Sequence, residues 1–437
     1  MRKIIELVDN NICSGCGICV SVCPRKCFEI QFTDSGQYRP IIPKERIADC
    51  IDCHICSKSC GFLTDYQVNR NTKYDFHIGE YYSTYSAYVT DDKLRLKSAS
   101  GGVATQFLKS LIKNNIVNYV VCVRQVANKH PLIKPVICKT EDEIDACSGS
   151  FYYPVEYSDI IRYILLNDGR YAIVGLPCVL RSIENAKSIN KKLKERILIT
   201  IGLVCGSNKN AAHTDFLLKK YGNQETIHSI NFRLKLENTQ SSSYNFQFNH
   251  DKKLIIDNKQ WGKYWSLGAF NLKSCSYCTD VFAEKADIVL MDAWKYPYVN
   301  DYKGTNFVVI RNKVIDNLFR NLTDCQIEPV DIQDIVYSQK YFASPIIDKQ
   351  HNNLYNKNKY SSLLYKDRFE YKRIGLLAKL QLTIKNKSQE LVYKNYKLNN
   401  KFDFIEFEKK LNKMLMYNQY ISLFIKVKRK LQKIVKK

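Results

Sequence analysis

The stretch from Cys13 to Cys60 decides how the rest of the chain is organised. It contains two cysteine runs of the same spacing, Cys13-x2-Cys16-x2-Cys19-x3-Cys23-Pro24 and, 25 residues later, Cys50-x2-Cys53-x2-Cys56-x3-Cys60. In each run the x2 spacing lets one tight loop present three thiolates together. Gly15, Gly17 and Pro24 suit such a loop, because glycine tolerates a positive φ and proline fixes a turn.

The doubled spacing matches that of bacterial two-cluster ferredoxins, in which the fourth cysteine of each run binds the cluster of the other run. The sequence therefore predicts two [4Fe–4S] clusters. We expect one cluster to be held by Cys13, Cys16, Cys19 and Cys60, and the other by Cys50, Cys53, Cys56 and Cys23. Gly61 follows the second run where a proline is usual, and this departure changes no ligand.

Two other uses of paired cysteines fit less well. Tetrahedral zinc sites need two Cys-x2-Cys doublets and have no use for eight cysteines in this repeat. A disulfide framework would require an export signal, whereas the N-terminus offers only the short charged sequence Met1-Arg2-Lys3-Ile4-Ile5-Glu6. Cys27 lies outside the pattern, and we expect it to be a small buried side chain.

Length and composition indicate the class of protein. A chain of 437 residues with 45% hydrophobic residues can bury a large core and form two or three domains. No apolar run approaches the length of a membrane-spanning helix. Seventeen cysteines, most of them clustered or beside strand-like segments, suit metal chemistry in a reducing cytoplasm. We therefore expect a cytoplasmic protein.

Positive charge is concentrated near the C-terminus. The formal net charge is +24, and residues 371–437 hold 18 lysines and arginines against 4 aspartates and glutamates. The absence of a nucleic-acid-binding motif argues against a nucleic-acid partner. We expect this basic tail to make a peripheral contact with anionic lipid or a partner protein, and to be dispensable for redox chemistry.

Strand-like and helical segments alternate after the cysteine-rich unit. Residues 1–65 form the predicted α+β ferredoxin domain, with a short strand over Phe28–Phe32, and Asp65–Gly79 is a predicted linker. The alternation predicts an α/β domain with a largely parallel sheet over residues 80–331. Its expected strands are Tyr81–Val89, Val117–Val123, Tyr171–Leu176, Ile197–Val204, Ile288–Met291 and Phe307–Ile310, and its expected helices begin after Gly102 and cover Glu141–Ala146 and Val179–Ala186.

Two segments depart from this alternation. Ile230–Asp257 is predicted to be a β-rich insertion. After Asp331 the strand signals fade, and residues 332–437 are predicted to form an extension that ends in a basic helix over Phe404–Lys437. The apolar band of this helix fits packing on its own domain as well as contact with a membrane surface or a partner.

Four further cysteines are candidates for a third metal site. Cys178 and Cys205 each follow a predicted parallel strand, so both should emerge at the carboxyl edge of the sheet, where α/β proteins bind ligands. Cys275-x2-Cys278 is a doublet typical of metal sites. Four thiolates suit a [4Fe–4S] cluster, but zinc fits the same ligand count. Cys178 as a lone nucleophile is a further alternative, although no histidine pattern points to its base.

A phosphate or a cofactor could bind at two small-residue loops. Ser100-Gly101-Gly102 opens a predicted helix, whose backbone N–H groups and dipole favour an anion. Gly149-Ser150 before Tyr152 is a similar loop. The sequence contains neither G-x-G-x-x-G nor a Walker motif, so a Rossmann or P-loop nucleotide site is not indicated.

The order of these elements resembles that in the family of coenzyme F420 hydrogenase/dehydrogenase beta subunits. With the ferredoxin unit the resemblance covers residues 10–315, and an ordered set of motifs is more specific than any one of them. The motifs are Ser100-Gly101-Gly102-Val103-Ala104-Thr105, Gly149-Ser150-x-Tyr152, Val174-Gly175-Leu176-Pro177-Cys178, Ile201-Gly202-Leu203-Val204-Cys205, Asn231-Phe232-Arg233, Cys275-x2-Cys278-Thr279-Asp280, Ala286-Asp287-Ile288 and Gly304-Thr305.

The resemblance implies an FAD-containing iron–sulfur oxidoreductase, related in fold to plant hydroxymethyl-chlorophyll reductase. It implies FAD at the carboxyl edge of the sheet and favours a cluster over zinc at Cys178, Cys205, Cys275 and Cys278. Many bacterial members are encoded among genes for surface-polysaccharide synthesis, which suggests a sugar-linked substrate. The residues expected to bind FAD are Ser100, Gly101, Gly102, Thr105, Gly149, Ser150 and Tyr152.

Three positions depart from the family pattern. The chain has Phe151 where the family often has lysine, Val179 where glutamine is usual, and Met291 where glycine is usual. Phe151 removes a cation that could lie near a flavin or an anionic substrate. The resemblance therefore supports iron–sulfur and flavin chemistry more firmly than it supports the deazaflavin as the partner.

The sequence thus predicts an oxidoreductase that passes electrons between a low-potential one-electron carrier and a two-electron substrate. Expected partners are a ferredoxin-like protein or reduced deazaflavin, and a small-molecule substrate. One alternative is a non-catalytic subunit that relays electrons to a partner protein. A structural zinc protein is a third interpretation, which bound iron and acid-labile sulfide would exclude.

Overall fold

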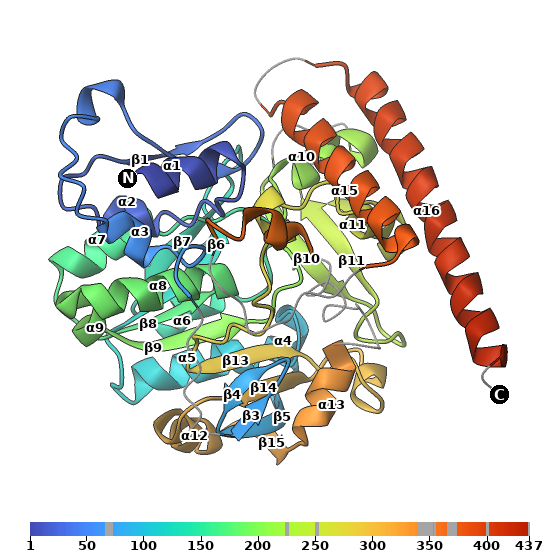
Figure 1. The fold of residues 1–437 in the computed structure, drawn as a ribbon. Coiled ribbons are helices and arrows are strands. Elements are labelled where there is room, and N and C mark those ends of the chain that lie inside the picture. The colour runs from blue at the N-terminus through green and yellow to red at the C-terminus, as the bar shows by residue number, and fades with distance from the viewer. Residues whose placement is uncertain are drawn as a thin grey trace.

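The structure is a computed structural model. It describes residues 1–65, 73–222, 227–249, 253–339, 353, 355–364, 374–398 and 402–435. Its main parts are an N-terminal cysteine-rich unit, a large mixed sheet, a smaller antiparallel sheet and a pair of long C-terminal helices (Figure 1).

The N-terminal unit is a small α+β fold. Its strands β1 (Glu29–Phe32) and β2 (Tyr38–Ile41) form an antiparallel hairpin, and short helices follow the cysteine loops. Ile4, Val20 and Phe28 pack beside the cysteines in its interior, while Ile18 and Val22 of the α2 region pack into the core of the central domain. The helices are α1 (Arg2–Asp9), α2 (Ile18–Ser21), η1 (Lys44–Arg46) and α3 (Ile55–Ser59).

The central sheet has eight strands in the order β15-β5-β14-β13-β9-β8-β6-β7. Strands β13, β9, β8 and β6 are parallel neighbours, and β5 points the same way, so five of the eight strands share one direction. The bounds are β5 (Ser83–Val89), β6 (Tyr119–Gln125), β7 (Ile133–Cys138), β8 (Tyr171–Gly175), β9 (Ile197–Leu203), β13 (Ile288–Asp292), β14 (Asn306–Ile310) and β15 (Cys325–Pro329).

All six strands expected in this domain are present within a few residues of their predicted bounds. Strands β7 and β15 were not predicted, and both are antiparallel edge strands. Pro135 and Pro329 lie in them, and proline normally weakens a strand prediction because it cannot donate a ladder hydrogen bond. The predicted largely parallel sheet is therefore parallel at its centre and antiparallel towards both edges.

Helices cover both faces of this sheet. Alternate residues of β6 show the two cores: Val121 packs with one helical layer, and Val120 with the other. Such burial on both sides explains the continuous apolar runs of the strands. One layer contains α7 (Ser158–Leu166), α8 (Pro177–Ile189) and α9 (Lys191–Arg196), and the other contains α5 (Val103–Lys113), α6 (Glu141–Asp145) and α12 (Lys313–Arg320).

The predicted β-rich insertion is confirmed as a separate antiparallel sheet. Its strands are β10 (Ser229–Lys235), β11 (Tyr244–Asn249) and β12 (Lys253–Ile256). An aromatic core lies between this sheet and its covering helices, with Phe232, Phe246 and Phe248 at its centre. The helices are α10 (Ala212–Tyr221), α11 (Asn258–Leu267), α15 (Leu376–Asn395) and α16 (Phe404–Val435).

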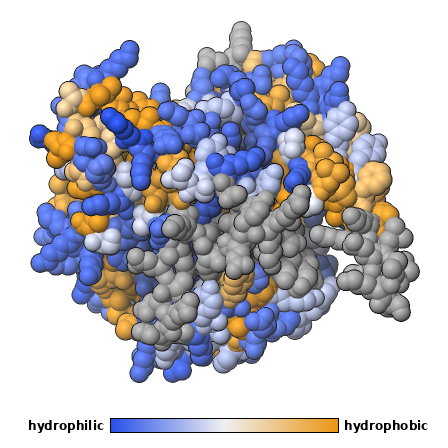
Figure 2. Space-filling view, in the orientation of Figure 1, coloured by the Kyte–Doolittle hydropathy of each residue, from blue (hydrophilic) through white to orange (hydrophobic). Residues whose placement is uncertain are grey.

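The basic C-terminal helix is confirmed as α16, and its first half is packed against the body of the protein. Val392 of α15, Tyr396, and Phe407, Leu411 and Leu415 of α16 are buried in the aromatic core. The second half of α16 extends beyond the body (Figure 1), and hydrophobic side chains remain exposed along it (Figure 2). The tail is therefore an integral part of the fold, which opposes the expectation that it is dispensable.

The remaining elements connect these parts. Residues 66–72 of the predicted linker lie outside the described residues, and the end of the linker forms a hairpin of β3 (Lys73–Asp75) and β4 (Gly79–Tyr81). No helix in the described ranges is both long enough and apolar enough to cross a bilayer. The other helical elements are α4 (Asp92–Lys97), η2 (Lys273–Ser276), η3 (Tyr298–Asn300), α13 (Ile332–Tyr337) and η5 (Asn358–Tyr360).

Candidate iron–sulfur and cofactor sites

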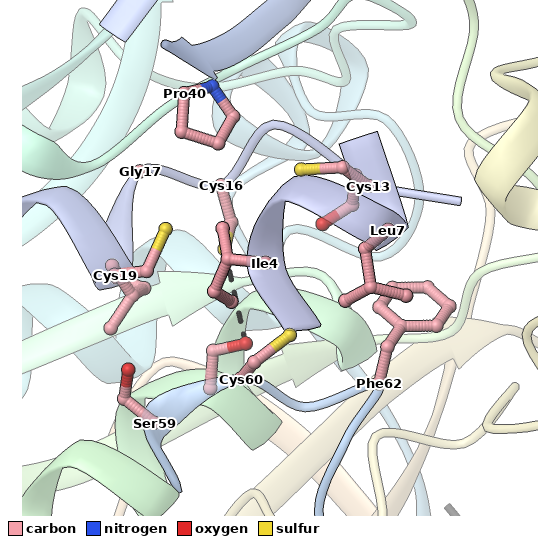
Figure 3. A pocket seen from close by; sticks show the side chains of 13 residues that line it. Ile4, Leu7, Cys13, Cys16, Gly17, Cys19, Pro40, Ser59, Cys60 and Phe62 are labelled. Atoms are coloured by element: carbon pink, nitrogen blue, oxygen red, sulfur yellow. Dashed lines mark hydrogen bonds between the residues drawn. The ribbon is translucent and has the colours of Figure 1, made fainter. Parts of the chain in front are cut away.

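The first cysteine cavity lies beneath helix α1. Its lining includes Cys13, Cys16 and Cys19 from the first run and Cys60 from the second. Figure 3 shows their sulfur atoms around the same space, with Ile4 and Leu7 of α1 beside them. The cavity therefore gathers the four cysteines that the ferredoxin spacing assigns to one cluster.

The second cavity contains the complementary set of cysteines. It is lined by Cys50, Cys53 and Cys56 from the second run and by Cys23 from the first. Cys53 is exposed, so this cavity lies near the surface. The two cavities together reproduce the exchange of the fourth cysteine between runs.

Backbone N–H groups point at the thiols in both cavities. The Gly15 N–H lies 3.4 Å from Cys13 Sγ, and the Cys27 N–H lies 3.4 Å from Cys23 Sγ. Such donors stabilise negative charge on sulfur, as cluster ligation requires. Gly15 has a φ of 74°, and a Cβ there would lie 2.3 Å from Tyr38 O, so the loop has room for glycine alone.

Helix α8 joins the first cavity to the central sheet. Ser182 Oγ accepts a hydrogen bond from the Gly61 N–H at 3.0 Å and lies 3.8 Å from Cys16 Sγ. The same hydroxyl donates to the Cys178 carbonyl oxygen at 3.0 Å. Gly61 stands where a proline is usual in ferredoxins, and the N–H bond to Ser182 gives the reason, because proline has no N–H to donate.

The third group of cysteines assembles at the carboxyl edge of the sheet. Cys178 begins α8 after β8, Cys205 follows β9, and Cys275 and Cys278 lie in and after η2. The Cys205 N–H donates to Val281 O at 3.0 Å, which ties the end of β9 to the segment after the doublet. Burial, followed by the neighbouring thiols of Cys278, Cys205 and Cys275, raises the pKa of Cys178.

Polar groups surround this third group. The Asn208 N–H donates to Cys275 Sγ at 3.2 Å, and Asn353 Nδ2 donates to the carbonyl oxygens of Cys275 at 2.9 Å and Cys278 at 2.7 Å. Burial raises the pKa of Cys275, whereas the Asn208 N–H and the ammonium groups of Lys385 and Lys209 lower it. Lys385 belongs to α15, so the C-terminal helices reach this site.

A polar site lies further along the same sheet edge, where β5 and β13 end. Lys235 Nζ of β10 donates to the carbonyl oxygens of Arg95 at 2.5 Å and Ser100 at 2.8 Å, and also to that of Lys303. Burial lowers the pKa of Lys235 to about 7, since the charged ammonium loses water there. Ser100 Oγ donates to Thr305 O at 2.9 Å.

Arg233 brings the second predicted loop to this site. Its guanidinium pairs with Asp292, the last residue of β13, at 2.7 Å, and donates to Tyr152 Oη at 3.2 Å. It also stacks over the Tyr244 ring, with 4.0 Å between the guanidinium carbon and the ring centroid. Arg233 and Lys235 thus connect the Ser100 loop with the Gly149–Tyr152 loop.

Hydroxyl groups form a second link between these loops. Ser148 Oγ lies 3.1 Å from Ser98 Oγ and 3.5 Å from Thr105 Oγ1. The residues predicted from the sequence to bind FAD therefore belong to two loops that meet at one place. Lys235, Asp292 and Ser148 were missed by sequence reasoning, and Arg233 was quoted only as part of a motif, because no local pattern marks a residue that acts across the chain.

The two glycines before α5 are required by the protein's own packing. A Cβ at Gly101 would lie 2.8 Å from Ala87 O and 2.9 Å from Asn306 N. A Cβ at Gly102, whose φ is 82°, would lie 2.8 Å from a Val89 methyl group. The space beside Gly149 is open, with no atom within 4 Å of a Cβ built there. Of these glycines, only Gly149 borders free space that a cofactor could occupy.

The three departures from the family pattern have different surroundings. Phe151 packs against the aromatic core, while the Arg233 guanidinium supplies a positive charge to the polar site. Val179 and Met291 are buried in the core beneath α8, so these two changes affect packing.

Two family profiles match the chain, and both describe the coenzyme F420 hydrogenase/dehydrogenase beta subunit. The profile of its N-terminal part matches residues 84–162, and the profile of its C-terminal part matches residues 168–334. These ranges cover the central sheet from β5 to α13, with the third cysteine group and the polar site.

Relatives of known activity are redox proteins. The chain is 24% identical to a subunit of the F(420)H(2) dehydrogenase of Methanosarcina mazei over 74% of this chain and 85% of that protein. It is 23% identical to the coenzyme F420-dependent sulfite reductase of Methanocaldococcus jannaschii over 81% of this chain and 53% of that protein. A shorter match, 24% over 48% of this chain and 44% of that protein, is to rice 7-hydroxymethyl chlorophyll a reductase.

A solved structure shares the fold. A chain of the F420-reducing [NiFe] hydrogenase complex of Methanosarcina barkeri aligns over 67% of this chain and 96% of its own length, with a TM-score of 0.51 and 16% identity. The two family profiles, together with these relatives, show that the chain belongs to the family of coenzyme F420 hydrogenase/dehydrogenase beta subunits.

Proposed function

We propose that the protein is an iron–sulfur flavoprotein oxidoreductase that moves electrons between a low-potential one-electron carrier and a two-electron substrate. Two [4Fe–4S] clusters occupy the N-terminal unit, a third is bound by Cys178, Cys205, Cys275 and Cys278, and FAD binds near the polar site. The observation that carries this proposal is the division of the eight N-terminal cysteines between two cavities with their fourth ligands exchanged.

The spacing of the third cysteine group supports a cluster there. Among the described residues, the one group of three or more candidate ligand atoms within 4.8 Å of one another is Cys122, Cys138 and Cys147. Tetrahedral zinc with bonds of about 2.3 Å would hold its sulfur atoms about 3.8 Å apart. In a cluster each thiolate binds a different iron, which needs a wider spread. The third group and the two ferredoxin groups are not gathered within 4.8 Å, which favours a cluster over a single zinc ion in each.

The order of the sites supports an electron path. The exposed Cys53 places the second cavity where an external carrier can approach, and the nearby Ile47 and Ile51 are 55% and 57% exposed. Such exposed apolar side chains suit the docking of a redox protein. From the first cavity, Ser182 connects Cys16 to Cys178 of the third group. Electrons would therefore pass from the surface through three clusters towards the sheet edge.

The polar site is the proposed place for FAD and the substrate. When bound, FAD exchanges a hydride with a two-electron substrate and single electrons with the clusters. Arg233 keeps a positive charge at the site, and Arg233 and Lys235 together hold the two loops in place. We include a sugar-linked substrate in this proposal, and reduced deazaflavin as an alternative electron donor, because the family resemblance suggests both.

A catalytic subunit and a relay subunit predict different behaviour. Purification of the full chain without oxygen, followed by iron, acid-labile sulfide and flavin analysis, should give about twelve irons, as three cubes require, and one FAD. Repeated two-electron oxidation of reduced deazaflavin by the isolated chain, with a one-electron dye as the acceptor, would support an enzyme. Clusters without FAD, and without turnover until a partner protein is added, would favour the relay subunit.

The exposed part of α16 supports a peripheral contact with anionic lipid. Leu423 and Phe424 are 58% and 65% exposed, and the sequence from Lys426 to Lys437 is rich in lysine. Apolar insertion and attraction to anionic headgroups would act together there. Flotation with vesicles containing phosphatidylserine should carry the protein at low salt, and Phe424→Asp should weaken this. Binding to neutral vesicles that salt does not affect would contradict electrostatic docking.

A further inference from the structure

Three cysteines that the sequence left without a role converge in the core of the central domain. The Sγ atoms of Cys122, Cys138 and Cys147 all lie within 4.8 Å of one another. Cys138 Sγ and Cys147 Sγ are 3.8 Å apart, and all three side chains are buried. No motif in the sequence includes these three cysteines, and their convergence was not predicted.

Three separate elements bring these thiols together. Cys122 lies on β6 and Cys138 on β7, where Cys138 is paired with Val120, so the two cysteines are diagonal neighbours on one face of the hairpin. Cys147 follows α6, whose start is fixed by a capping box between Thr140 and Glu143. The geometry is therefore held by a strand pair and a capped helix.

A fourth polar atom completes the arrangement. The Glu143 carbonyl oxygen, in the last turn of α6, lies 3.5 Å from Cys138 Sγ and 3.3 Å from Cys147 Sγ. A tetrahedral zinc ion with Zn–S bonds of about 2.3 Å and a Zn–O bond of about 2.1 Å would separate sulfur atoms by about 3.8 Å and sulfur from oxygen by about 3.6 Å. The separations among Cys138 Sγ, Cys147 Sγ and the Glu143 oxygen are close to these values, and Cys122 Sγ lies within 4.8 Å of the other two sulfur atoms.

We propose that Cys122, Cys138, Cys147 and the Glu143 carbonyl oxygen form a structural site for a zinc-class divalent cation. Soft thiolate ligands select such ions, and zinc binding releases the thiol protons. Three thiolates with a divalent cation leave one net negative charge, which a dry core tolerates far better than three. A disulfide would use only two of the three thiols and would need a sulfur separation of about 2.05 Å.

The proposed ion would fix the loop that begins at Cys147. The next residue, Ser148, makes the hydroxyl contacts to Ser98 and Thr105, and Gly149–Tyr152 follow. An ion that joins Cys147 to the β6–β7 hairpin would therefore hold this loop in place beside the polar site. The site is separate from the three cluster groups and does not depend on the proposed flavin chemistry.

The test is the zinc content and zinc coordination of the full chain, purified without oxygen. We expect about one zinc per chain, and a zinc-edge X-ray absorption spectrum with three sulfur neighbours at about 2.3 Å and one oxygen at about 2.1 Å. This spectrum does not detect the iron clusters, so it reports on zinc alone. Cys122→Ser should lower the zinc content at least tenfold and leave the iron content unchanged.

Cys325→Ser is the matched control, because Cys325 lies on β15 of the same sheet but outside the cysteine group, and it should keep its zinc. Zinc retained in Cys122→Ser would mean that the metal occupies a cluster site, and would overturn the proposal. So would the absence of zinc from the wild-type chain, or a Cys138–Cys147 disulfide found by mass spectrometry after anaerobic alkylation. If Cys122→Ser does not fold, the wild-type spectrum still decides between these outcomes.

Discussion

The N-terminal unit and the central domain hold their cysteines in different ways. In the N-terminal unit, the small buried cluster around Phe28 consists of three cysteines together with Ile4, Val20 and Phe28. The central domain has two large apolar cores, and of its third cysteine group only Cys178 packs against one of them, as a partly buried side chain. We therefore expect iron–sulfur clusters to be essential for folding of the N-terminal unit, and the central domain to fold without its cluster.

The largest expected effect comes from removing the C-terminal helices. Truncation before Tyr371 removes Val392, Tyr396, Phe407, Leu411 and Leu415 from the aromatic core. At about 1.5–3 kcal/mol for each buried apolar side chain, the loss matches the whole stability of a typical domain. We expect an unfolded or aggregated chain by circular dichroism and size-exclusion chromatography.

A chain that ends at Val427 is the control for this truncation, since it keeps all five buried side chains, and it should fold normally. A truncated chain that keeps its cofactors would instead show that the tail is a separate, dispensable unit.

Removing the clusters should separate the two regions. Iron extraction by a chelator with a mild oxidant should unfold residues 1–65 and leave the central sheet intact, because metal binding supplies folding free energy to a small core. Hydrogen exchange should then rise in α2 and α3 and remain slow in β8 and β9. Equal loss of protection in both regions would contradict the comparison.

Exchange of the fourth ligand predicts crossed effects of two serine variants. Cys23→Ser should disturb the cluster in the cavity with Cys50, Cys53 and Cys56, and Cys60→Ser should disturb the cluster with Cys13, Cys16 and Cys19. Electron paramagnetic resonance of the reduced variants should show loss of a different cluster signal in each. Loss of the Cys13 cluster in Cys23→Ser would show that each run holds its own cluster.

The sequence predicts a site well when the residues of that site lie close together along the chain, and poorly when they lie far apart. The ferredoxin groups need only residues a few positions apart and one repeat, so the spacing predicted which cysteines would share each cavity. Cys178 and Cys205 could be grouped because a parallel sheet places the ends of its strands at one edge, and Cys275 and Cys278 were added as a metal-type doublet. The polar site depends on contacts of Lys235 and Arg233 with loops more than 80 residues earlier in the chain. The group of three thiols that includes Cys147 depends on strand β7, which was not predicted.

A smaller effect is expected where the two regions meet. Ser182→Ala would leave the buried Gly61 N–H without its acceptor, at a cost of about 1–3 kcal/mol. We expect the contact between α8 and the N-terminal unit to open at a lower denaturant concentration, as measured there by hydrogen exchange or limited proteolysis. Ser188→Ala, an exposed serine on the same helix, is the control and should change little. Equal stability of both variants would mean that packing of α8 on the N-terminal unit does not depend on the hydrogen bond from Gly61 to Ser182.

A further effect is a titration within the central domain, which is spread over several pH units. Because burial lowers the pKa of Lys235 to about 7, the unfolded chain binds one more proton between about pH 7 and pH 10. Stability should therefore fall as the pH falls through this window, by at most about 1.4 kcal/mol per pH unit for one proton. Lys235→Met should flatten this dependence.

Competitive acetylation followed by mass spectrometry reports the pKa directly. Lys235 should change reactivity near pH 7, whereas Asp92 raises the pKa of Lys303, which serves as the internal control. The same midpoint for both lysines would contradict the desolvation of Lys235.

The central claim is a chain of three clusters that leads to a flavin, and an anaerobic reductive titration tests it most directly. The account predicts uptake of about five electrons per protein, one for each of three [4Fe–4S] clusters and two for FAD, with Cys275→Ser taking up one fewer. Uptake of about two electrons, with no flavin bleaching and no change in Cys275→Ser, would leave only the ferredoxin clusters and contradict the account.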